Sequence, residues 1–345
     1  MRTKKNWMKS VLAFGLAASL AACGSSNTAV PAAPDSNPQA NGKGEPTKLT
    51  VALDWYPNAV HSFLYVAQEK GFFQEENLDV HLQMPSDSND PLKMVAAGKV
   101  DLAISYQTQV VQARAEGIPV VSVAALVRHP LNAIMTRQDS GLDSPEKLAG
   151  KAIGFPSIPF NESIVRTAVK HAGGDDSGLS FIDIGFDIVP ALTGKKVDAV
   201  VGGYINHEGP ILEKHGVPLN IFKPTDFGVP DYYELILTTS DDQWEQKKQA
   251  FEAFMRAAAK AQKYVAENPK PALDLLLAKQ AEEFPLEEDI ETKSLEILLP
   301  LMDAGDKPFG YQTEESWQTL INWMKKEKLI SGDVQASQIV RQFAN

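Results

Sequence analysis

The chain has 345 residues and carries 33 Lys and Arg against 44 Asp and Glu, a formal net charge of −11 at pH 7. This acidic balance disfavours binding to nucleic acid and to anionic lipid. A single hydrophobic core rarely serves a chain of this length, so we expect two lobes.

Residues 1–22 have the composition of a secretory signal peptide. Basic residues precede an apolar run at 11–22, which is shorter than the roughly 20 residues of a membrane-spanning helix. Cys23 follows Leu20-Ala21-Ala22, as in a lipoprotein cleavage site, and it is the only cysteine. We therefore predict removal of residues 1–22 and lipid attachment at Cys23; a buried N-terminal helix is the alternative. A lone cysteine excludes an intramolecular disulfide or a redox pair.

Residues 23–48 are rich in Ser, Asn, Pro, Ala and Gly and lack hydrophobic periodicity, which is typical of a flexible linker. Loss of the signal peptide removes four basic residues and no acidic ones, which leaves a net charge of about −15. Acyl chains on Cys23 would anchor this mature chain to the membrane. We expect a lipid-anchored protein on the extracytoplasmic side of the cell membrane.

Strands and helices then alternate. We expect strands at 49–53, 78–82, 102–104 and 120–126, and helices at 60–77, 91–97 and 108–115. A second set begins at Ser144-Pro145, where Ser144 is a candidate N-cap, and continues with a strand at 151–155 and a helix that ends at Gly173. This alternation implies βαβ units with helices on both faces of each sheet.

After a strand at 234–238 the chain is mostly helical. An apolar face is expected from the spacing of Phe251, Phe254, Met255 and Ala258. The similar spacing of Trp317, Leu320, Ile321 and Met324 indicates core packing rather than a cofactor site. We expect this C-terminal third to pack against the first lobe.

Residues 98–120 resemble residues 194–219, because each segment has a Gly-Lys turn, an apolar strand opened by Asp, a polar cluster and a closing Gly-x-Pro. The separation is too long for a solenoid repeat, so a duplicated domain is the better interpretation. We predict an α/β fold with lobe 1 at 49–130 plus 240–345 and lobe 2 at 131–239. Crossings near 127–137 and 234–239 would form a hinge.

Ligands of parallel α/β sheets lie beyond the carboxyl ends of the strands. In the two repeats these ends carry Ser105-Tyr106-Gln107 and Tyr204-Ile205-Asn206-His207-Glu208. The two clusters are therefore expected to face each other across a cleft.

Two further motifs carry a family resemblance. The segment Asp54-Trp55-x-Pro57-Asn58-x-x-His61 and the segment Tyr204-x-Asn206-His207-Glu208 resemble those of bacterial substrate-binding lipoproteins that capture pyrimidine precursors of thiamine for ABC transporters. The run Lys70–Val80 is common to the wider superfamily, which includes nitrate, sulfonate and taurine receptors and the eukaryotic thiamine pyrimidine synthase. The resemblance covers residues 48–310 and implies a type II periplasmic-binding-protein fold, with two doubly wound lobes joined by a two-crossing hinge.

The resemblance also implies an aminopyrimidine ligand in formylaminomethyl, aminomethyl or hydroxymethyl form. A flat ring with an amino donor beside a nitrogen acceptor needs aromatic faces and a polar edge, for which Trp55 and Tyr204 supply the faces. Glu208 is the first candidate for the amino group, Asp54 the second, and Asn58 and Asn206 complete the hydrogen bonds. The full set of predicted ligand-binding residues is Asp54, Trp55, Asn58, His61, Ser105, Tyr106, Gln107, Pro156, Ser157, Tyr204, Asn206 and Glu208.

Each prediction has a structural alternative. Trp55 could cover the core of lobe 1, His61 could support its neighbours, and Asn206 and Glu208 could cap the next helix. Ordinary strand-end hydrogen bonds could account for residues 105–107. Loop geometry could account for the prolines of Pro156–Asn161, although a helix N-terminus can also bind a polar group.

The predicted function is capture of the pyrimidine and its delivery to an ABC permease. The chain lacks a GxxxxGK[ST] loop, so the ATPase must be a separate subunit. We expect a monomer with no cofactor, no metal and no nucleic-acid partner. The alternatives are a receptor for alkanesulfonate, nitrate or a riboflavin-like ligand, and a synthase-like enzyme. A synthase-like enzyme would be expected to have a Cys-rich motif and a lysine after the strand end at Ser105–Thr108, and this chain has neither. An anion receptor would be expected to have Arg or Lys at the strand ends.

Overall fold

The computed structural model of this chain describes residues 44–280 and 282–343. The predicted signal peptide, Cys23 and most of the predicted linker lie outside these residues. Strand β1 begins at Thr47, so Thr47 and Lys48 belong to a sheet and not to the linker as predicted. No helix in the described part of the chain is long and apolar enough to cross a membrane.

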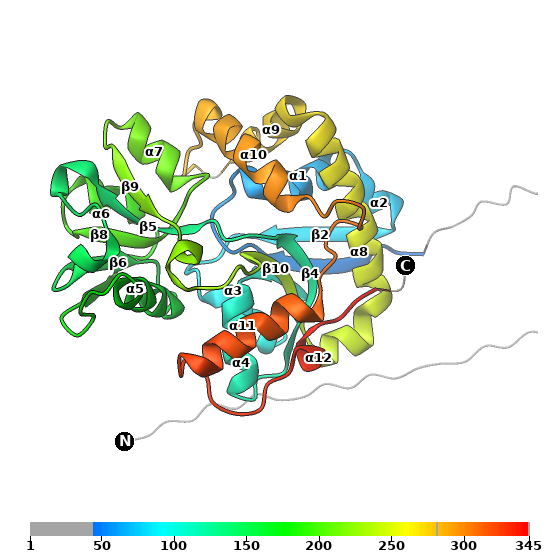
Figure 1. Cartoon of the computed structure of the whole chain (residues 1–345). Helices are drawn as coiled ribbons and strands as arrows, with labels where there is room; N and C mark the ends of the chain where they lie inside the picture. The colour runs from blue at the N-terminus through cyan, green and yellow to red at the C-terminus, as the bar shows by residue number, and fades with distance from the viewer. Residues whose placement is uncertain (1–43, 281, 344–345) are drawn as a thin grey trace, which may run out of the picture. The chain divides into compact units, whose positions relative to one another are not determined.

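The first sheet has the strand order β2-β1-β3-β10-β4 (Figure 1). Its strands are β1 (Thr47–Ala52), β2 (Leu78–Gln83), β3 (Leu102–Ser105), β4 (Val120–Val127) and β10 (Leu235–Ser240). Strand β1 runs parallel to β2 and β3, whereas β10 runs antiparallel to β3 and β4. All of β4 and β10 is buried, as expected for a sheet covered on both faces.

The second sheet repeats this arrangement in the order β7-β6-β8-β5-β9. Its strands are β5 (Asn132–Arg137), β6 (Ala152–Phe155), β7 (Ser180–Asp183), β8 (Ala199–Tyr204) and β9 (Leu219–Phe222). Here β6 is parallel to β7 and β8, and β5 is antiparallel to β8 and β9. The fourth strand is the reversed one in each sheet, which agrees with the predicted duplication.

The aspartate of each repeat performs the same structural task. Asp101 accepts a hydrogen bond from the backbone N–H of Thr50 (2.8 Å), and Asp198 accepts one from Ala152 (2.9 Å). Asp101 therefore links the loop before β3 to β1, and Asp198 links the loop before β8 to β6.

The chain passes from the first sheet to the second between β4 and β5, and it returns between β9 and β10. The return lies earlier than predicted, because β10 pairs with β3 and β4 and so belongs to the first sheet. The predicted end of lobe 2 at residue 239 is therefore too late. We propose that the two lobes meet at residues 128–131 and 223–234.

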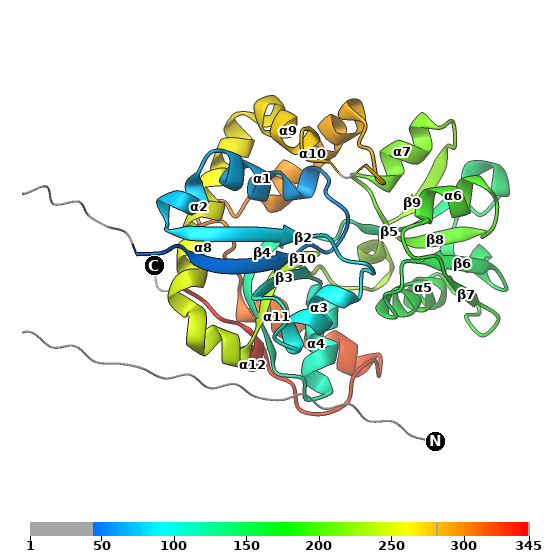
Figure 2. The ribbon, with the colours of Figure 1, turned by 180° about the vertical axis from the view of Figure 1, so that it is seen from behind.

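Helices cover both sheets (Figures 1 and 2). Those in the first half of the chain are α1 (Ser62–Glu69), α2 (Phe72–Glu75), α3 (Asp90–Ala96), α4 (Gln107–Ala115) and α5 (Phe160–His171). The later ones are α6 (Ile188–Thr193), α7 (Glu208–Lys214), α8 (Asp241–Glu267), α9 (Pro269–Leu277), α10 (Glu288–Met302), α11 (Glu314–Lys326) and α12 (Ala336–Ile339). Short 3₁₀ turns are η1 (Ala59–His61), η2 (Gln138–Ser140), η3 (Pro145–Leu148) and η4 (Pro224–Phe227).

Two predicted helices differ in the structure. The helix expected over 60–77 is divided into η1, α1 and α2, because Gly71 has a φ of 74° and ends α1 in the left-handed conformation that favours glycine. The helix expected at Ser144 is the single turn η3. Ser144 donates to the carboxylate of Glu146 and does not cap the backbone.

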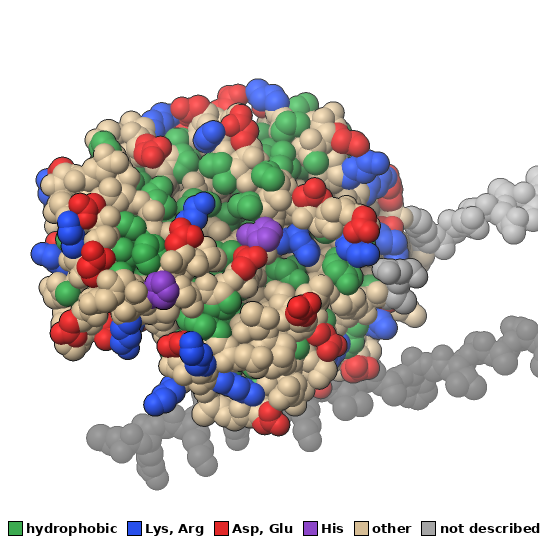
Figure 3. Space-filling model, in the orientation of Figure 1, with side chains coloured by type: hydrophobic (Ala, Val, Ile, Leu, Met, Phe, Trp, Pro, Cys, Tyr) green, Lys and Arg blue, Asp and Glu red, His purple; other side chains and the backbone are tan. Residues whose placement is uncertain are grey.

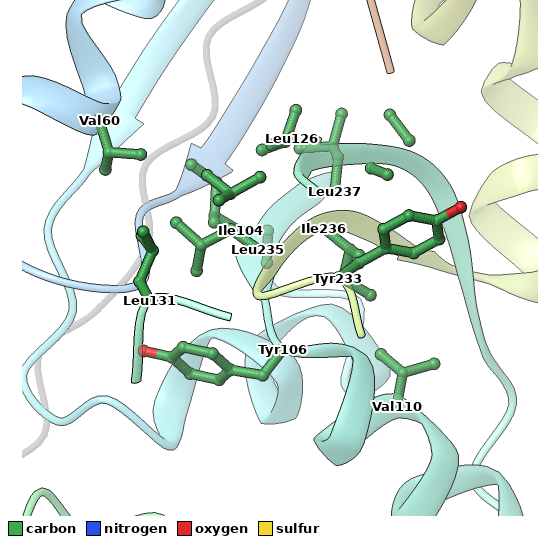
Figure 4. Close-up of a cluster of buried hydrophobic side chains, with 14 of the residues drawn as sticks. Val60, Ile104, Tyr106, Val110, Leu126, Leu131, Tyr233, Leu235, Ile236 and Leu237 are labelled. Carbon is green, nitrogen blue, oxygen red and sulfur yellow. The ribbon is translucent and has the colours of Figure 1, made fainter. Parts of the chain in front are cut away.

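The C-terminal helices pack mainly on the first sheet, as predicted, with α8 against α1, α2 and β10. The predicted apolar face of α8 is buried. Figure 4 shows the core beside β10, where Leu235, Ile236 and Leu237 lie among side chains of neighbouring strands. Helix α10 differs, since it also contacts α7 of lobe 2. The face in Figure 3 mixes basic and acidic side chains rather than presenting one sign of charge.

Trp317 tests the predicted core role of α11. Its side chain is fully buried, and its indole N–H donates to Gln312 Oε1 (3.0 Å). We expect Trp317→Ala to lower the free energy of unfolding by about 3–5 kcal/mol through the cavity it leaves. Urea unfolding would measure the loss. Thr319→Ala, at an exposed position of the same helix, should change it by less than about 0.5 kcal/mol; equal effects of the two would contradict a core role.

Candidate functional site

A narrow cavity lies between the lobes where the predicted strand ends meet. Its volume is about 30 Å³. The walls come from the loops after β1, β3, β6 and β8 and from the two crossings. The lining residues are Asp54, Trp55, Asn58, Val60, Tyr106, Thr108, Asn132, Pro156, Ile158, Phe160, Asn161, Gly202, Tyr204, Asn206, His207, Glu208, Tyr232 and Glu234.

Eight of the twelve predicted residues line this cavity: Asp54, Trp55, Asn58, Tyr106, Pro156, Tyr204, Asn206 and Glu208. The structure thus brings both repeat-derived clusters to one site.

The other four predicted residues do not line the cavity. Ser105 donates to Gln109, and Gln107 accepts from the backbone N–H of Tyr233. Ser157 bonds to Asp183 at the rim, and His61 lies behind Asp54. Strand-end hydrogen bonding therefore accounts for Ser105, whereas Gln107 begins α4 and no described residue accepts from its buried Nε2.

His61 orients Asp54. The backbone N–H of Asn58 donates to His61 Nδ1 (3.2 Å), which assigns the ring proton to Nε2. The Nε2–H group of His61 in turn donates to Asp54 Oδ1 (2.9 Å), and both side chains are buried. Asn58 also caps η1 by accepting from Val60 N–H. One short turn thus fixes two polar groups of the cavity wall.

Glu208 is held by its neighbours. His207 Nδ1 lies 2.8 Å from one carboxylate oxygen, and the backbone N–H of Tyr204 donates to the other (2.9 Å). Burial alone would raise the pKa of the Glu208 carboxyl, but His207 and this backbone bond outweigh it and leave the pKa below its usual value. Glu208 is therefore a carboxylate at neutral pH, with both oxygens already accepting.

Asn206 offers an open acceptor. Its Nδ2 donates to Ser294 Oγ (2.9 Å), whereas no described residue donates to its buried Oδ1. An unpaired buried carbonyl costs about 1–3 kcal/mol. Because Asn206 lines the cavity, a hydrogen-bond donor placed there would satisfy this oxygen.

Glu234, a residue that the sequence analysis did not select for the site, lies where the two crossings meet. It accepts from the backbone N–H groups of Leu131 (2.8 Å) and Asn132 (2.9 Å), and the hydroxyl of Tyr204 lies 3.4 Å away. Burial raises its pKa to about 7, although these bonds oppose the rise. The signal for Glu234 was a carboxylate directly before a strand that opens with Leu235, Ile236 and Leu237.

Asn132 and Asn161 were also missed. Asn132 Nδ2 donates to Asn161 Oδ1 (2.7 Å), and Asn132 Oδ1 accepts from the N–H of Gly202. Gly202 has a φ of 90°, and a Cβ there would lie 2.5 Å from Pro156. No spacing rule in the sequence joins residues 132, 161 and 202; only the strand order β6-β8-β5 brings them together.

Aromatic rings close one end of the site. Trp55 packs edge-on against Phe186 of lobe 2 at 4.4 Å between ring centroids. Tyr56 stacks on Phe284 at 4.6 Å with nearly parallel planes. Burial raises the pKa of the Tyr106 and Tyr204 hydroxyls well above the usual value, so both remain neutral hydrogen-bonding groups.

The chemistry of the lining is that of a receptor for a neutral or cationic flat molecule. It supplies three carboxyl groups, four amides and several aromatic rings, and its lining contains no Lys or Arg. The one cationic lining residue, His207, is already paired with Glu208 and Glu291, so an anion would find no free positive charge there. No cluster of potential metal ligands occurs among the described residues.

Comparisons with known proteins agree with this picture. The family model described as NMT1/THI5 like matches residues 58–272. Over 277 residues the chain is 46% identical to the formylaminopyrimidine-binding protein of Halalkalibacterium halodurans, covering 80% of this chain and 84% of that protein. It is 32% identical to a putative thiamine biosynthesis protein of Haemophilus influenzae, covering 82% and 88%.

A relative of another kind is the 4-amino-5-hydroxymethyl-2-methylpyrimidine phosphate synthase of Legionella pneumophila, at 26% identity over 85% of this chain and 90% of that protein. Among solved structures, the alkanesulfonate-binding protein SsuA of Xanthomonas axonopodis pv. citri, bound to MOPS, has a TM-score of 0.68 at 14% identity, covering 87% of this chain and all of that one. At an identity this low, the structural similarity is evidence for the fold alone. It confirms the predicted type II periplasmic-binding-protein fold. Since the family model matches more than half of the chain and two relatives exceed 30% identity over most of their length, the chain belongs to the NMT1/THI5-like family.

Proposed function

We propose that this chain is the substrate-binding component of an ABC importer that captures a thiamine pyrimidine precursor between its lobes and delivers it to a permease. The observation that carries the proposal is the cavity lining, which is rich in acceptors and aromatic rings and free of Lys and Arg. An aminopyrimidine presents an amino donor and a flat ring to such a lining. The relative that is 46% identical is named for binding formylaminopyrimidine, which supports the same ligand class.

In this proposal Asn206 Oδ1 accepts from the ligand, because it is the buried acceptor that the described residues leave unpaired. Trp55, Tyr106 and Tyr204 supply the faces of the slot, and Asp54 and Glu234 supply further polar groups. Glu208 acts mainly by holding the loop after β8, since both of its oxygens are already engaged.

The alternatives have less support. A sulfonate or nitrate ligand lacks a free cationic partner in this cavity, since His207 is already paired with two carboxylates, although the structural relatives include sulfonate receptors. A synthase activity is suggested by relatives at 26–27% identity. The expected Cys-rich motif is absent, since the single cysteine is the proposed lipid anchor. We propose a non-enzymatic monomer that needs no cofactor.

Binding tests the function directly. Residues 24–345 would be titrated with the formylaminomethyl, aminomethyl and hydroxymethyl pyrimidines. Taurine, nitrate and riboflavin would be tested separately as alternative ligands. One pyrimidine at a hundred times its Kd should stabilise the protein by about 2.7 kcal/mol, seen as a rise in Tm. A response to anions or flavin alone would reject the pyrimidine.

Asn206→Ala should weaken pyrimidine binding roughly 5- to 150-fold, since it removes the acceptor for the ligand's donor. Calorimetry would give both Kd values. Ser294→Ala is the matched control, because Ser294 bonds the other end of the Asn206 amide and does not line the cavity. Equal losses in the two variants would mean that Asn206 serves structure rather than ligand.

Glu234 should make stability depend on pH. Its pKa is about 7 in the folded protein and near 4.5 when unfolded, so the folded state binds the extra proton between these values. The stability from this proton is present below pH 4.5 and is lost as pH rises through 7. The difference in unfolding free energy between wild type and Glu234→Gln should fall by on the order of 3 kcal/mol from pH 4.5 to 8. Parallel pH profiles would show that Glu234 titrates normally.

Lipid attachment at Cys23 is expected to hold the protein at the membrane. In cells that process lipoproteins, Cys23→Ser should release the protein from the membrane fraction, because the acyl chains supply the anchoring energy. Fractionation and labelling with a fatty-acid analogue would follow this change. Unchanged membrane association of the variant would contradict lipid anchoring.

A further inference from the structure

Helix α10 connects the two walls of the ligand cavity. It belongs to the C-terminal part of the chain, packs against η1 of lobe 1, and lies beside α7 of lobe 2 (Figure 1). Three of its side chains bond to lobe 2: Ser294 to Asn206, Glu291 to His207, and Asp289 to Lys214. Two of these partners, Asn206 and His207, line the cavity.

Glu291 is the buried member of this set. Its side chain is 1% exposed, and it has a partner on each side of the cleft. One oxygen accepts from the backbone N–H of Ala59 (2.7 Å), between the lining residues Asn58 and Val60. The other oxygen lies 3.3 Å from His207 Nε2. Glu291 itself is not part of the cavity wall.

The groups that face His207 are acidic or aromatic. Glu208 on its own loop contacts Nδ1, Glu291 on α10 contacts Nε2, and the Tyr56 ring lies 5.7 Å from the imidazole. Glu283 and Glu287 line a second pocket, which His207 and Glu291 also line. Both ring nitrogens therefore point at carboxylates, an arrangement that requires a proton on each nitrogen for full hydrogen bonding.

We propose that Glu291 is a positioning residue for ligand capture: it ties the loop of Asn58 to the loop of Asn206 and Glu208 when the lobes close. This role rests on the proposed function, since it takes the cavity as the ligand site. Glu291 acts through Ala59 and His207 and does not touch the ligand. When the lobes separate, His207 moves away with lobe 2 and Glu291 stays with lobe 1, so the pair forms on closure.

The electrostatics of His207 support this role. Burial lowers its pKa, but Glu208 and Glu291 outweigh burial and raise the pKa to about 10. Separation of the lobes removes Glu291 from His207 but leaves Glu208 in place, so the part of this rise that Glu291 contributes exists only in the closed state. This part favours closure while His207 is protonated and is lost as pH rises toward 10.

The variant Glu291→Gln keeps an acceptor for Ala59 and removes the charge that faces His207. We expect it to weaken binding of the pyrimidine about tenfold or more, mostly through faster dissociation. Asp289→Asn is the control on the same helix, since it also loses an ion pair to lobe 2 but an exposed one, and it should change Kd less than about twofold. Equal effects would overturn the proposal.

A pH profile separates positioning from simple structural support. Wild-type affinity should decline as pH rises toward 10, because the Glu291–His207 pair that forms on closure holds a proton. In Glu291→Gln this contribution is gone, so affinity should decline less over the same range. Superimposable profiles, or a His207 NMR signal that titrates near 6.5 in the liganded wild type, would overturn the proposal.

Two further measurements keep the outcomes distinct. If no pyrimidine binds, the proposed function fails, and the ligand-free proteins are compared by unfolding. Wild-type stability should then fall between pH 7 and 10 more than that of Glu291→Gln, and identical profiles would reject the interlobe tie.

If Glu291→Gln does not fold, the double variant His207→Gln/Glu291→Gln removes both charges. It should fold and bind about tenfold more weakly than wild type, and unchanged binding would reject the role.

Discussion

The structure depends on how buried carboxyl groups are satisfied between the lobes. Asp54, Glu208, Glu234 and Glu291 are all nearly inaccessible to solvent. Burying such groups without partners would cost several kcal/mol each. Their partners are backbone N–H groups, two histidines and a tyrosine hydroxyl, most of which lie in another loop. Satisfying these groups therefore fixes the loops relative to one another, so the cavity keeps its shape only when both lobes contribute.

The duplicated fold explains where these loops lie. Each sheet has the same strand order with its fourth strand reversed, and that strand directly follows a crossing between lobes. The loops after β3 and β8 occupy equivalent places, and the aspartates before them make equivalent bonds. Their side chains have diverged, since the first repeat presents Tyr106 whereas the second presents Asn206 and Glu208. Each lobe nevertheless supplies both kinds of group, because Asp54 and Asn58 line the cavity from lobe 1 and the Tyr204 ring lines it from lobe 2.

Much of this could be predicted from sequence, but unevenly. The 98–120 and 194–219 repeat and the strand-end rule placed Tyr106, Tyr204, Asn206 and Glu208 correctly in the cavity wall. Ser105 and Gln107 lie outside this wall, because Ser105 ends β3 one residue before Tyr106 and points the other way, and Gln107 begins helix α4. Glu234 and Glu291 were missed because neither lies in a repeat or a motif. Their burial follows from the crossings and from α10, which depend on tertiary packing of segments far apart in sequence.

The same packing accounts for ligand class better than the fold does. Receptors with this fold include proteins for alkanesulfonates, which need positive charge, whereas this cavity wall contains no Lys or Arg and its one cationic residue, His207, is already paired. The sheets can be shared because they set only the positions of the loop ends. The charge of the cavity wall is set by a few loop residues and by the buried groups that neutralise them. Here His207 is the one cation near the wall described by the structure, and Glu208 and Glu291 compensate it from both sides. An anion would have to displace one of these carboxylates, whereas a neutral ring with an amino donor leaves them all in place.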